Sequence, residues 1–235
     1  MYKLRLQLKD LSKISVLADD LTGSCDTAAQ FCSYGLTTAV TSDITVSCDF
    51  PVEVIVVNTA TRNVPEEKAR SIVSSTLKRL KHLNRKIVYK KIDSTAKGNW
   101  VVEIKEVMKI MQPDIVIVAP AFPTWGRTIR NGMLCIKGHI PSSSISRHNS
   151  KFNNIDLFCK LQSEFGSQVD LIRREILLQR SSGIERYIHQ KGQRIFLFDV
   201  EHNSDLKEIV KAGCRLGKKI LWVGSAGLAR FLPLG

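Results

Sequence analysis

The stretch VLADDLTGSCDTAAQF, residues Val16 to Phe31, decides the fold and points to one edge of it. The apolar run from Ile14 to Ala18 has the composition of a buried strand, and it stops at two adjacent aspartates, Asp19 and Asp20. Small apolar residues then recur at helical spacing and predict the buried face of a helix: Cys25, Ala28, Ala29 and Cys32. A strand that leads through a polar turn into a helix is the repeating unit of an α/β sheet.

The rest of the chain repeats this alternation. Apolar runs predict further strands at residues 37–41, 52–57, 87–92, 114–119, 194–200 and 219–223. Helical patterns cover residues 65–83, 101–111, 155–165, 183–190 and 205–216. The less regular stretch from Phe122 to Asn154 contains a predicted pair of short strands at Gly132 to Ile140. Together these patterns predict an α/β fold in three layers, a mostly parallel sheet flanked by helices on both faces.

Composition limits the class of protein. With 235 residues, 43% of them hydrophobic, the chain can bury a substantial core. No apolar run approaches the roughly 20 residues of a membrane span, and the N-terminus lacks the apolar segment of a secretion signal, so we expect a cytoplasmic protein without a membrane partner. The cysteines show neither CxxC pairs nor zinc spacing, which predicts reduced, mostly buried side chains and no metal site. They are Cys25, Cys32, Cys48, Cys135, Cys159 and Cys214.

The net charge of +13 favours an anionic partner, either a small acidic metabolite or a nucleic acid. The densest basic run, Leu77 to Lys91, spans a predicted helix end and the next strand. We interpret it as a solvated helix face with cations near the negative end of the helix dipole. It lacks the interleaved aromatic ladder of single-strand binders, so the sequence favours the small metabolite.

Polar residues gather where the predicted strands end. In open α/β sheets, ligands bind beyond the carboxyl ends of the strands. Five predicted strand ends combine glycines, hydroxyls and charges: residues 19–23, 58–62, 93–99, 120–128 and 224–227. One such end is ordinary turn and cap chemistry, whereas five on the same edge predict a site.

The residue types at these ends suit an acidic ligand that is rich in hydroxyls. The side chains that can bind a carboxylate or phosphate are Arg62, Lys91, Lys97 and Arg127. The carboxylates that can accept hydrogen bonds from hydroxyls, one of them also taking a proton, are Asp19, Asp20 and Asp93. The set predicts a pocket for a small polyhydroxy acid, in which nearby cations stabilise the adjacent aspartates.

Each of these residues, taken singly, also has a purely structural interpretation. Asp20 or Thr22 can cap the first helix. Arg62 can pair with a glutamate at the start of the next helix, at position 66 or 67. Asp93 can hold an Asx turn. The prediction of a site therefore rests on the five strand ends together.

Nucleotide-binding motifs are not evident in the sequence. The dinucleotide fingerprint GxGxxG is absent. The segment Gly213 to Lys218 is one residue short of a P-loop and lies in a helical pattern. The chain therefore shows no recognisable ATP-binding loop of its own.

Four segments in order carry a resemblance to a known family: ADDLTGSCDTAAQF, KKIDSTAKGNW, APAFPTWGRTIRNG and WVGSAGLA. From about Ile14 to Ala229 the chain resembles the N-terminal half of four-carbon acid sugar kinases. Members of this family phosphorylate acids such as threonate, erythronate or oxo-tetronate with ATP. They have two α/β domains, of which the first holds the acid and the second supplies most of the nucleotide site.

The resemblance implies an acid-binding domain at residues 1–222, followed at 223–235 by a hinge and the start of a nucleotide-binding domain. The residues implied to face the sugar acid are Asp19, Asp20, Gly23, Arg62, Lys91, Asp93, Ser94, Lys97, Gly98 and Arg127. Among these we expect Asp20 to be the catalytic proton acceptor. Ser225, together with Gly224 and Gly227, is expected to touch the nucleotide. ATP and Mg²⁺ are expected mainly at the second domain.

Two departures from the family pattern affect this interpretation. Lys97 replaces the arginine that is usual in the DST-x-RG motif, so a bidentate contact becomes a point charge. The chain is also about half the expected length. We therefore expect a fragment, a truncated gene product or one half of a split enzyme, with a separate nucleotide-binding half as partner. The alternative is a non-catalytic protein that binds an acidic metabolite or nucleic acid.

Overall fold

The computed structural model describes residues 14–43, 52–81, 87–137 and 155–235. Within these residues, eight strands form one sheet in the order β2-β3-β1-β4-β10-β5-β9-β8, and all neighbouring pairs are parallel. The strands are β1 Ile14–Ala18, β2 Thr38–Thr41, β3 Val54–Asn58, β4 Ile87–Lys91, β5 Ile115–Ala119, β8 Val169–Ile172, β9 Ile195–Phe198 and β10 Ile220–Gly224. A separate antiparallel hairpin consists of β6 Arg127–Arg130 and β7 Met133–Ile136.

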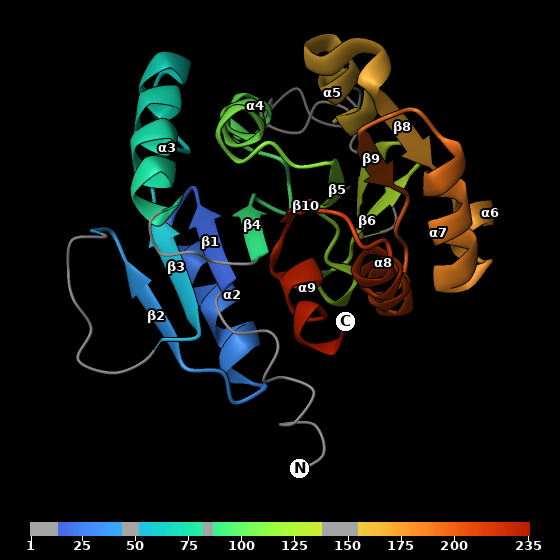
Figure 1. Ribbon diagram of the computed structural model, residues 1–235, viewed down its shortest axis with the longest axis horizontal. Helices are drawn as coiled ribbons and strands as arrows, with labels where there is room; N and C mark the ends of the chain where they lie inside the picture. The colour runs from blue at the N-terminus through green and yellow to red at the C-terminus, as the bar shows by residue number, and fades with distance from the viewer. Residues whose placement is uncertain (1–13, 44–51, 82–86, 138–154) are drawn as a thin grey trace.

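Helices cover both faces of the sheet, so the predicted three-layer α/β fold is confirmed (Figure 1). They are α2 Leu21–Cys32, α3 Glu66–Lys81, α4 Trp100–Met111, α5 Leu157–Phe165, α6 Arg174–Leu177, α7 Arg180–Gln190, α8 Asn203–Arg215 and α9 Ala226–Ala229. Helices α3, α4 and α5 lie on one face, whereas α2, α8 and α9 lie on the other, with α6 and α7 beside α8. Crossover helices of this kind are what parallel strands require.

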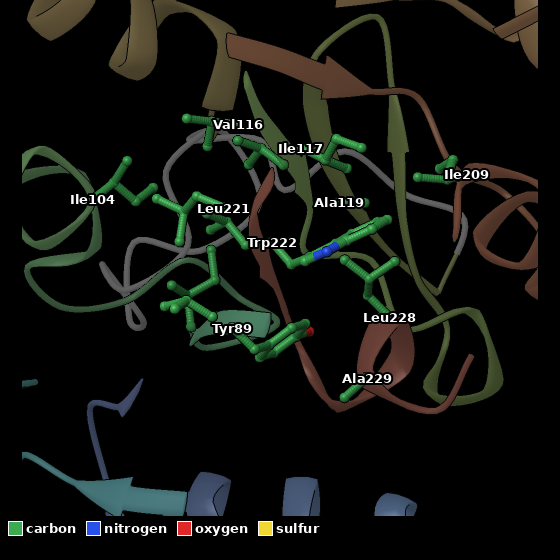
Figure 2. Packing of buried hydrophobic residues seen from close by; sticks show 14 of the residues in the cluster. Tyr89, Ile104, Val116, Ile117, Ala119, Ile209, Leu221, Trp222, Leu228 and Ala229 are labelled. Atoms are coloured by element: carbon green, nitrogen blue, oxygen red, sulfur yellow. The ribbon is translucent and has the colours of Figure 1, made fainter. Parts of the chain in front are cut away.

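The core lies between the sheet and these helices. Strands β1 and β5 are buried along their whole length, as the apolar runs predict. Figure 2 shows how Trp222 of β10 and Tyr89 of β4 pack among aliphatic side chains from several strands and helices. Burying one large apolar side chain contributes about 1.5–3 kcal/mol, so this cluster fixes the relative positions of the central strands.

The order of the strands creates a crevice at the centre of the sheet. β1 and β4 are hydrogen-bonded neighbours, yet the helices that follow them, α2 and α4, lie on opposite faces (Figure 1). The two chain segments that follow β1 and β4 therefore diverge beyond the carboxyl ends of these strands. This is the usual place for a ligand in an open α/β sheet. The stretch from Val16 to Phe31 supplies one side of this crevice.

The predicted buried face of α2 is confirmed for Ala28 but wrong for Cys25, Ala29 and Cys32, and the predicted burial of most cysteines is wrong. The residues that α2 buries are Gly23, Ser24, Thr27, Ala28 and Phe31. The helix is turned so that the aromatic ring of Phe31 faces the core, because burying a ring outweighs burying small side chains, whereas Leu21 at the start of the helix is exposed. All five described cysteines are free, but only Cys135 is buried, and Cys48 lies outside the described residues.

Other differences concern short elements. The hairpin lies at residues 127–136 instead of 132–140, and residues 138–140 are outside the described part. Its turn is Asn131-Gly132, both with positive φ, which is the usual turn of a two-residue hairpin loop. The edge strand β8 and helix α6, four residues each, were not predicted. Among the described helices, none has the length and apolar character needed to cross a membrane.

The predicted domain boundary at residues 222/223 falls inside β10, between β4 and β5 in the sheet. Helix α9 packs against α2 and α8 of the same body, and Leu232 is buried. The division of the chain into an acid-binding part and the start of a nucleotide-binding part stays a prediction.

Candidate functional site

A pocket of about 120 Å³ lies at the carboxyl edge of the sheet. Its lining comes from the segments that follow β1, β3, β4, β5 and β10, which are the five strand ends that the sequence singles out. The lining residues are Asp20, Thr22, Gly23, Asp26, Arg62, Lys91, Asp93, Ser94, Phe122, Ser225 and Ala226. Chain segments far apart in sequence thus meet at the crevice between β1 and β4.

Asp20 has a structural role as well as a place in the pocket. It is the N-cap of α2, and its Oδ1 accepts a hydrogen bond of 3.0 Å from the backbone N–H of Gly23. A short polar side chain at this position satisfies an N–H group that the helix leaves without a partner. The capping role considered from the sequence is therefore real, and it orients the carboxylate at the pocket wall.

Arg62 explains why two aspartates stand side by side. Its Nε and Nη2 donate to the two oxygens of Asp19, at 2.9 and 2.8 Å. Its Nη1 and Nη2 donate to the two oxygens of Asp20, at 2.7 and 2.8 Å. One guanidinium group thus bridges both carboxylates, and its described ion pairs are with these aspartates instead of with the glutamates of α3.

The contacts between Arg62 and Asp19 shift the pKa values of both groups. Burial alone raises the pKa of Asp19, which is only 1% exposed, but the hydrogen bond from Arg62 and the charges of Lys90, Arg62 and Lys91 outweigh it and hold the pKa below 3.8. Burial lowers the pKa of Arg62, but the bond to Asp19 and the nearby carboxylates outweigh this effect and raise it. Asp19 and Arg62 are therefore a charged pair at every ordinary pH.

Lys91, the last residue of β4, presents a buried ammonium group to the pocket. The residue is 4% exposed, and its Nζ donates one hydrogen bond of 3.0 Å to the carbonyl oxygen of Ile92. Desolvation lowers its pKa below 10.5, against the opposing effect of Asp19 and Asp20. The Nζ group lies beside Gly23, where a Cβ atom would stand 2.7 Å from it, so glycine leaves the space that this side chain occupies.

The turn after β4 contributes Asp93 and Ser94. Asp93 also holds its own turn: its Oδ2 accepts from the hydroxyl of Thr95, and its carbonyl oxygen accepts from Ala96 N–H at 2.9 Å. Asp93 therefore has a structural role in this turn, although its side chain accepts from the Thr95 hydroxyl and not from a backbone N–H as in an Asx turn. Asp93 nevertheless lines the pocket, where it adds a further carboxylate.

Ser225 closes the opposite side, in the turn between β10 and α9. Its hydroxyl donates to the carbonyl oxygen of Ala121 at 2.9 Å and accepts from the N–H of Gly227 at 3.1 Å. Its own carbonyl oxygen accepts from the buried hydroxyl of Tyr89, which points toward this turn in Figure 2. Ser225 therefore ties β10 to β4 and to the segment after β5.

Several predicted site residues lie outside the lining of the pocket. Asp19 lies behind Arg62, and Lys97 is exposed. Gly98 has φ of +84° and packs against Arg62, where a Cβ would lie 3.0 Å from the side-chain Cγ and 3.1 and 3.2 Å from the main-chain oxygen and Cα. The main chain of Arg127 pairs with Phe122 through bonds of 2.8 and 3.2 Å, and its side chain approaches the Trp125 carbonyl. Gly224 and Gly227 are the other two predicted site residues outside the lining of the pocket.

The pocket also contains four residues that were not named as predicted contacts, although three of them lie within the predicted strand ends. They are Thr22, Asp26, Phe122 and Ala226. Thr22 and Asp26 stand four residues apart on α2, next to Gly23, and therefore share one helix face. That spacing was a usable signal in the sequence. Phe122 lies in the predicted strand end at residues 120–128, but its residue type did not single it out, because an aromatic residue after a strand is as readily a core residue.

A buried ion pair lies behind the pocket. Lys90 of β4 and Glu103 of α4 are both fully buried, with Nζ 2.7 Å from Oε2. Lys90 also donates a hydrogen bond of 2.9 Å to the carbonyl oxygen of Lys91, at the end of the strand. Lys90 and Lys91 point to opposite faces of the sheet, as neighbouring residues in a strand do. The pair thus anchors the strand end that carries Lys91 to α4.

An open parallel sheet with a small, acceptor-rich pocket at its switch point defines an α/β domain that binds a small polar ligand. Comparison with known proteins makes the class specific. The family model described as sugar-binding N-terminal domain matches residues 14–232, and the chain belongs to this family. The matching relatives are four-carbon acid sugar kinases, so the resemblance inferred from the sequence motifs is confirmed.

Among the relatives, a D-threonate kinase of Salmonella typhimurium is 31% identical over 228 residues, which cover 94% of this chain and 53% of the relative. A 3-oxo-tetronate kinase of Pectobacterium atrosepticum is 25% identical over 225 residues, which cover 92% of this chain and 53% of the relative. The chain therefore spans about half the length of the curated relatives it matches.

Solved structures agree on the fold. A domain of unknown function from Bordetella bronchiseptica, a domain-swapped dimer with bound citrate, has a TM-score of 0.78 and 28% identity, and covers 94% of this chain and 55% of that protein. A Haemophilus influenzae protein has a TM-score of 0.81 at 24% identity, and the match covers 93% of this chain and 55% of that protein. At this identity the likeness supports the fold alone.

Proposed function

We propose that this chain binds a four-carbon sugar acid, of the threonate, erythronate or oxo-tetronate type, as the acceptor substrate of an ATP-dependent kinase. The observation that carries the proposal is the pocket at the switch point, where carboxylates and a buried ammonium group from five strand ends meet. Carboxylates accept hydrogen bonds from ligand hydroxyls, and an ammonium group pairs with a ligand carboxylate. The relatives named D-threonate kinase and 3-oxo-tetronate kinase support this class of acid.

Asp20 is the proposed proton acceptor for the reacting hydroxyl. Its Oδ1 accepts two hydrogen bonds, from Gly23 and Arg62, whereas Oδ2 accepts one, from Arg62. Oδ2 therefore keeps acceptor capacity for a hydroxyl of the ligand. The N-cap bond and the guanidinium group hold this oxygen in place, which is the positioning that general-base catalysis requires.

The described residues do not fit a site for Mg²⁺ and ATP. In the described part of the chain, no group of three or more His, Cys, Asp or Glu side chains is placed to hold a metal ion. Three carboxylates and two cations line the pocket, a balance that disfavours a polyphosphate. The hydroxyl of Ser225 is used within its own turn. We derive no phosphoryl-transfer step from these residues and propose that a second domain, attached or separate, binds the nucleotide.

Titration calorimetry of the purified chain with threonate, erythronate and 3-oxo-tetronate tests the proposal. We expect at least one acid to bind with a stoichiometry of one and to raise the thermal midpoint, because a ligand of the native state stabilises it. A folded chain that binds none of the three acids contradicts the proposal. A chain that prefers duplex DNA, with a steep salt dependence, supports instead the nucleic-acid alternative.

A further inference from the structure

We propose that Lys91, and not Arg62, holds the carboxylate of the bound acid and makes the pocket select acids over neutral polyols. The inference rests on the proposed function, because it assigns one end of the ligand to one side of the same pocket. It departs from the family resemblance, which implies a carboxylate contact by the residue at position 97.

Arg62 is not available for this contact. A guanidinium group has five N–H donors, and four of them point at the four oxygens of Asp19 and Asp20. The side chain is 19% exposed, and Gly98 packs against its main chain. Its charge is also compensated by two carboxylates. Arg62 therefore orders the wall of the pocket and offers a ligand at most one N–H.

Lys91, unlike Arg62, has N–H donors that remain available for a ligand. An ammonium group has three donors, and among the described residues its only hydrogen bond is the one to the Ile92 carbonyl oxygen. No carboxylate of the described part lies within 4 Å of its Nζ, although Asp19, Asp20 and Asp93 are near enough to act on its charge. The group is desolvated beside the first turn of α2, where the helix dipole also favours a negative charge. Two donors therefore remain for a carboxylate.

The other charges of the pocket fix the direction of the ligand. Asp20, Asp26 and Asp93 line the remaining wall and repel a carboxylate, but they accept hydrogen bonds from hydroxyls. An acid with a hydroxyl-bearing tail therefore fits in one direction only, with its carboxylate at Lys91 and its hydroxyls toward the aspartates. A neutral polyol of the same length satisfies the aspartates but leaves Lys91 unpaired.

The test compares D-threonate with threitol, the neutral four-carbon polyol, by calorimetry on four proteins. These are the unaltered chain and its Lys91→Met, Lys97→Met and Lys207→Met variants, the last an exposed lysine on α8 that serves as the matched control. Loss of a charged hydrogen bond corresponds to about a 10- to 100-fold weaker affinity. We expect Lys91→Met to lose that factor for threonate and to change threitol affinity by less than about threefold. We expect the other two variants to keep the preference for the acid.

The outcomes separate the inference from the proposed function. If Lys91→Met keeps the acid preference and Lys97→Met loses it, Lys97 holds the carboxylate and the inference is wrong. If the unaltered chain binds neither compound, the proposed function fails with it. A Lys91→Arg variant, which keeps the charge, covers the case in which methionine prevents folding. The Lys91→Arg variant should retain the preference for the acid. If it loses that preference as fully as Lys91→Met does, the result counts against a charge-based role.

Discussion

At the scale of single residues, the site depends on hydrogen bonds that pair its buried polar groups. Asp19 and Asp20 are tolerable as neighbours because one guanidinium group occupies all four of their oxygens. A buried charge that lacks such partners is strongly unfavourable, so the pair needs Arg62 to fold as it does. The sequence reveals the residue types but not which hydrogen bonds are already taken. For that reason it predicts Arg62 as a ligand contact, whereas we propose Lys91 for the carboxylate because four of the five N–H donors of Arg62 already point at Asp19 and Asp20.

The Asp20→Asn variant should fold and bind the acid more weakly. Asparagine is as good an N-cap as aspartate, so α2 keeps its first turn. The amide offers one acceptor oxygen in place of two and leaves Arg62 partly unpaired, which we expect to cost about 1–3 kcal/mol in binding. Calorimetry measures the loss, and Asp156→Asn, the same change at the N-cap of α5, is the matched control. Unchanged affinity in a folded Asp20→Asn variant would remove Asp20 from the site.

The Lys91→Met variant should be more stable than the unaltered chain at neutral pH. Burial lowers the pKa of Lys91 below 10.5, so between its folded pKa and 10.5 the unfolded chain binds more protons. The free energy of unfolding of the unaltered chain therefore rises through that window as the pH increases. The charged groups around Nζ, Asp19, Asp20, Arg62 and Asp93, are unchanged in the variant.

The measurement is urea unfolding of both proteins between pH 7 and pH 10.5. The advantage of the methionine variant should be largest at the lower pH and should shrink as the pH approaches 10.5. An advantage that does not vary with pH would show that side-chain packing, and not the charge, is responsible. A site that sacrifices stability for an available charge is typical of functional positions.

At the scale of elements, β4 and α4 hold the centre of the site. β4 carries Lys90 on one face and Lys91 on the other, and Glu103 of α4 pairs with the first of them. The sequence shows two adjacent lysines in an apolar strand but does not show their partner, thirteen residues later in a helix. The alternation of strands and helices, in contrast, follows from apolar periodicity alone, which is why most of the sheet could be predicted.

What could not be predicted has a physical cause in each case. The face of α2 is set by one aromatic ring, Phe31, and not by the more numerous small residues. The edge strand β8 has Asp170 within its four residues, so it lacks the continuous apolar run that predicts the equally short β9. Asp26 is different, because its position four residues after Thr22 on α2 was a signal that the sequence did offer.

The Glu103→Ala variant should be destabilised by about 3–5 kcal/mol, because it leaves the ammonium group of Lys90 buried and unpaired. The double variant Lys90→Met/Glu103→Leu should lose less than the single variant, since two apolar side chains need no partner. Urea unfolding measures both. A Glu103→Ala variant within about 1 kcal/mol of the unaltered chain would contradict a charged pair at this place.

At the scale of the whole molecule, charge is distributed unevenly. The chain carries a net charge of +13, yet more carboxylates than cations line its pocket. An overall positive field attracts anions to the molecule, whereas the pocket accepts a negative charge at one place only. This separation suits a small monocarboxylate with hydroxyls better than a polyphosphate.

We predict, therefore, that the 235-residue chain alone binds a sugar acid but does not phosphorylate it. Phosphoryl transfer depends on positioning and on neutralising charge around the transferred group, and the pocket of this chain offers acceptors where cations are needed. The test incubates the chain with ATP, Mg²⁺ and each of threonate, erythronate and 3-oxo-tetronate, with and without a separately expressed second half of a D-threonate kinase. Turnover that appears only with the added half, and that Asp20→Asn abolishes, is the expected result. Turnover by the chain alone would place a nucleotide site within this chain and overturn the proposed division of roles.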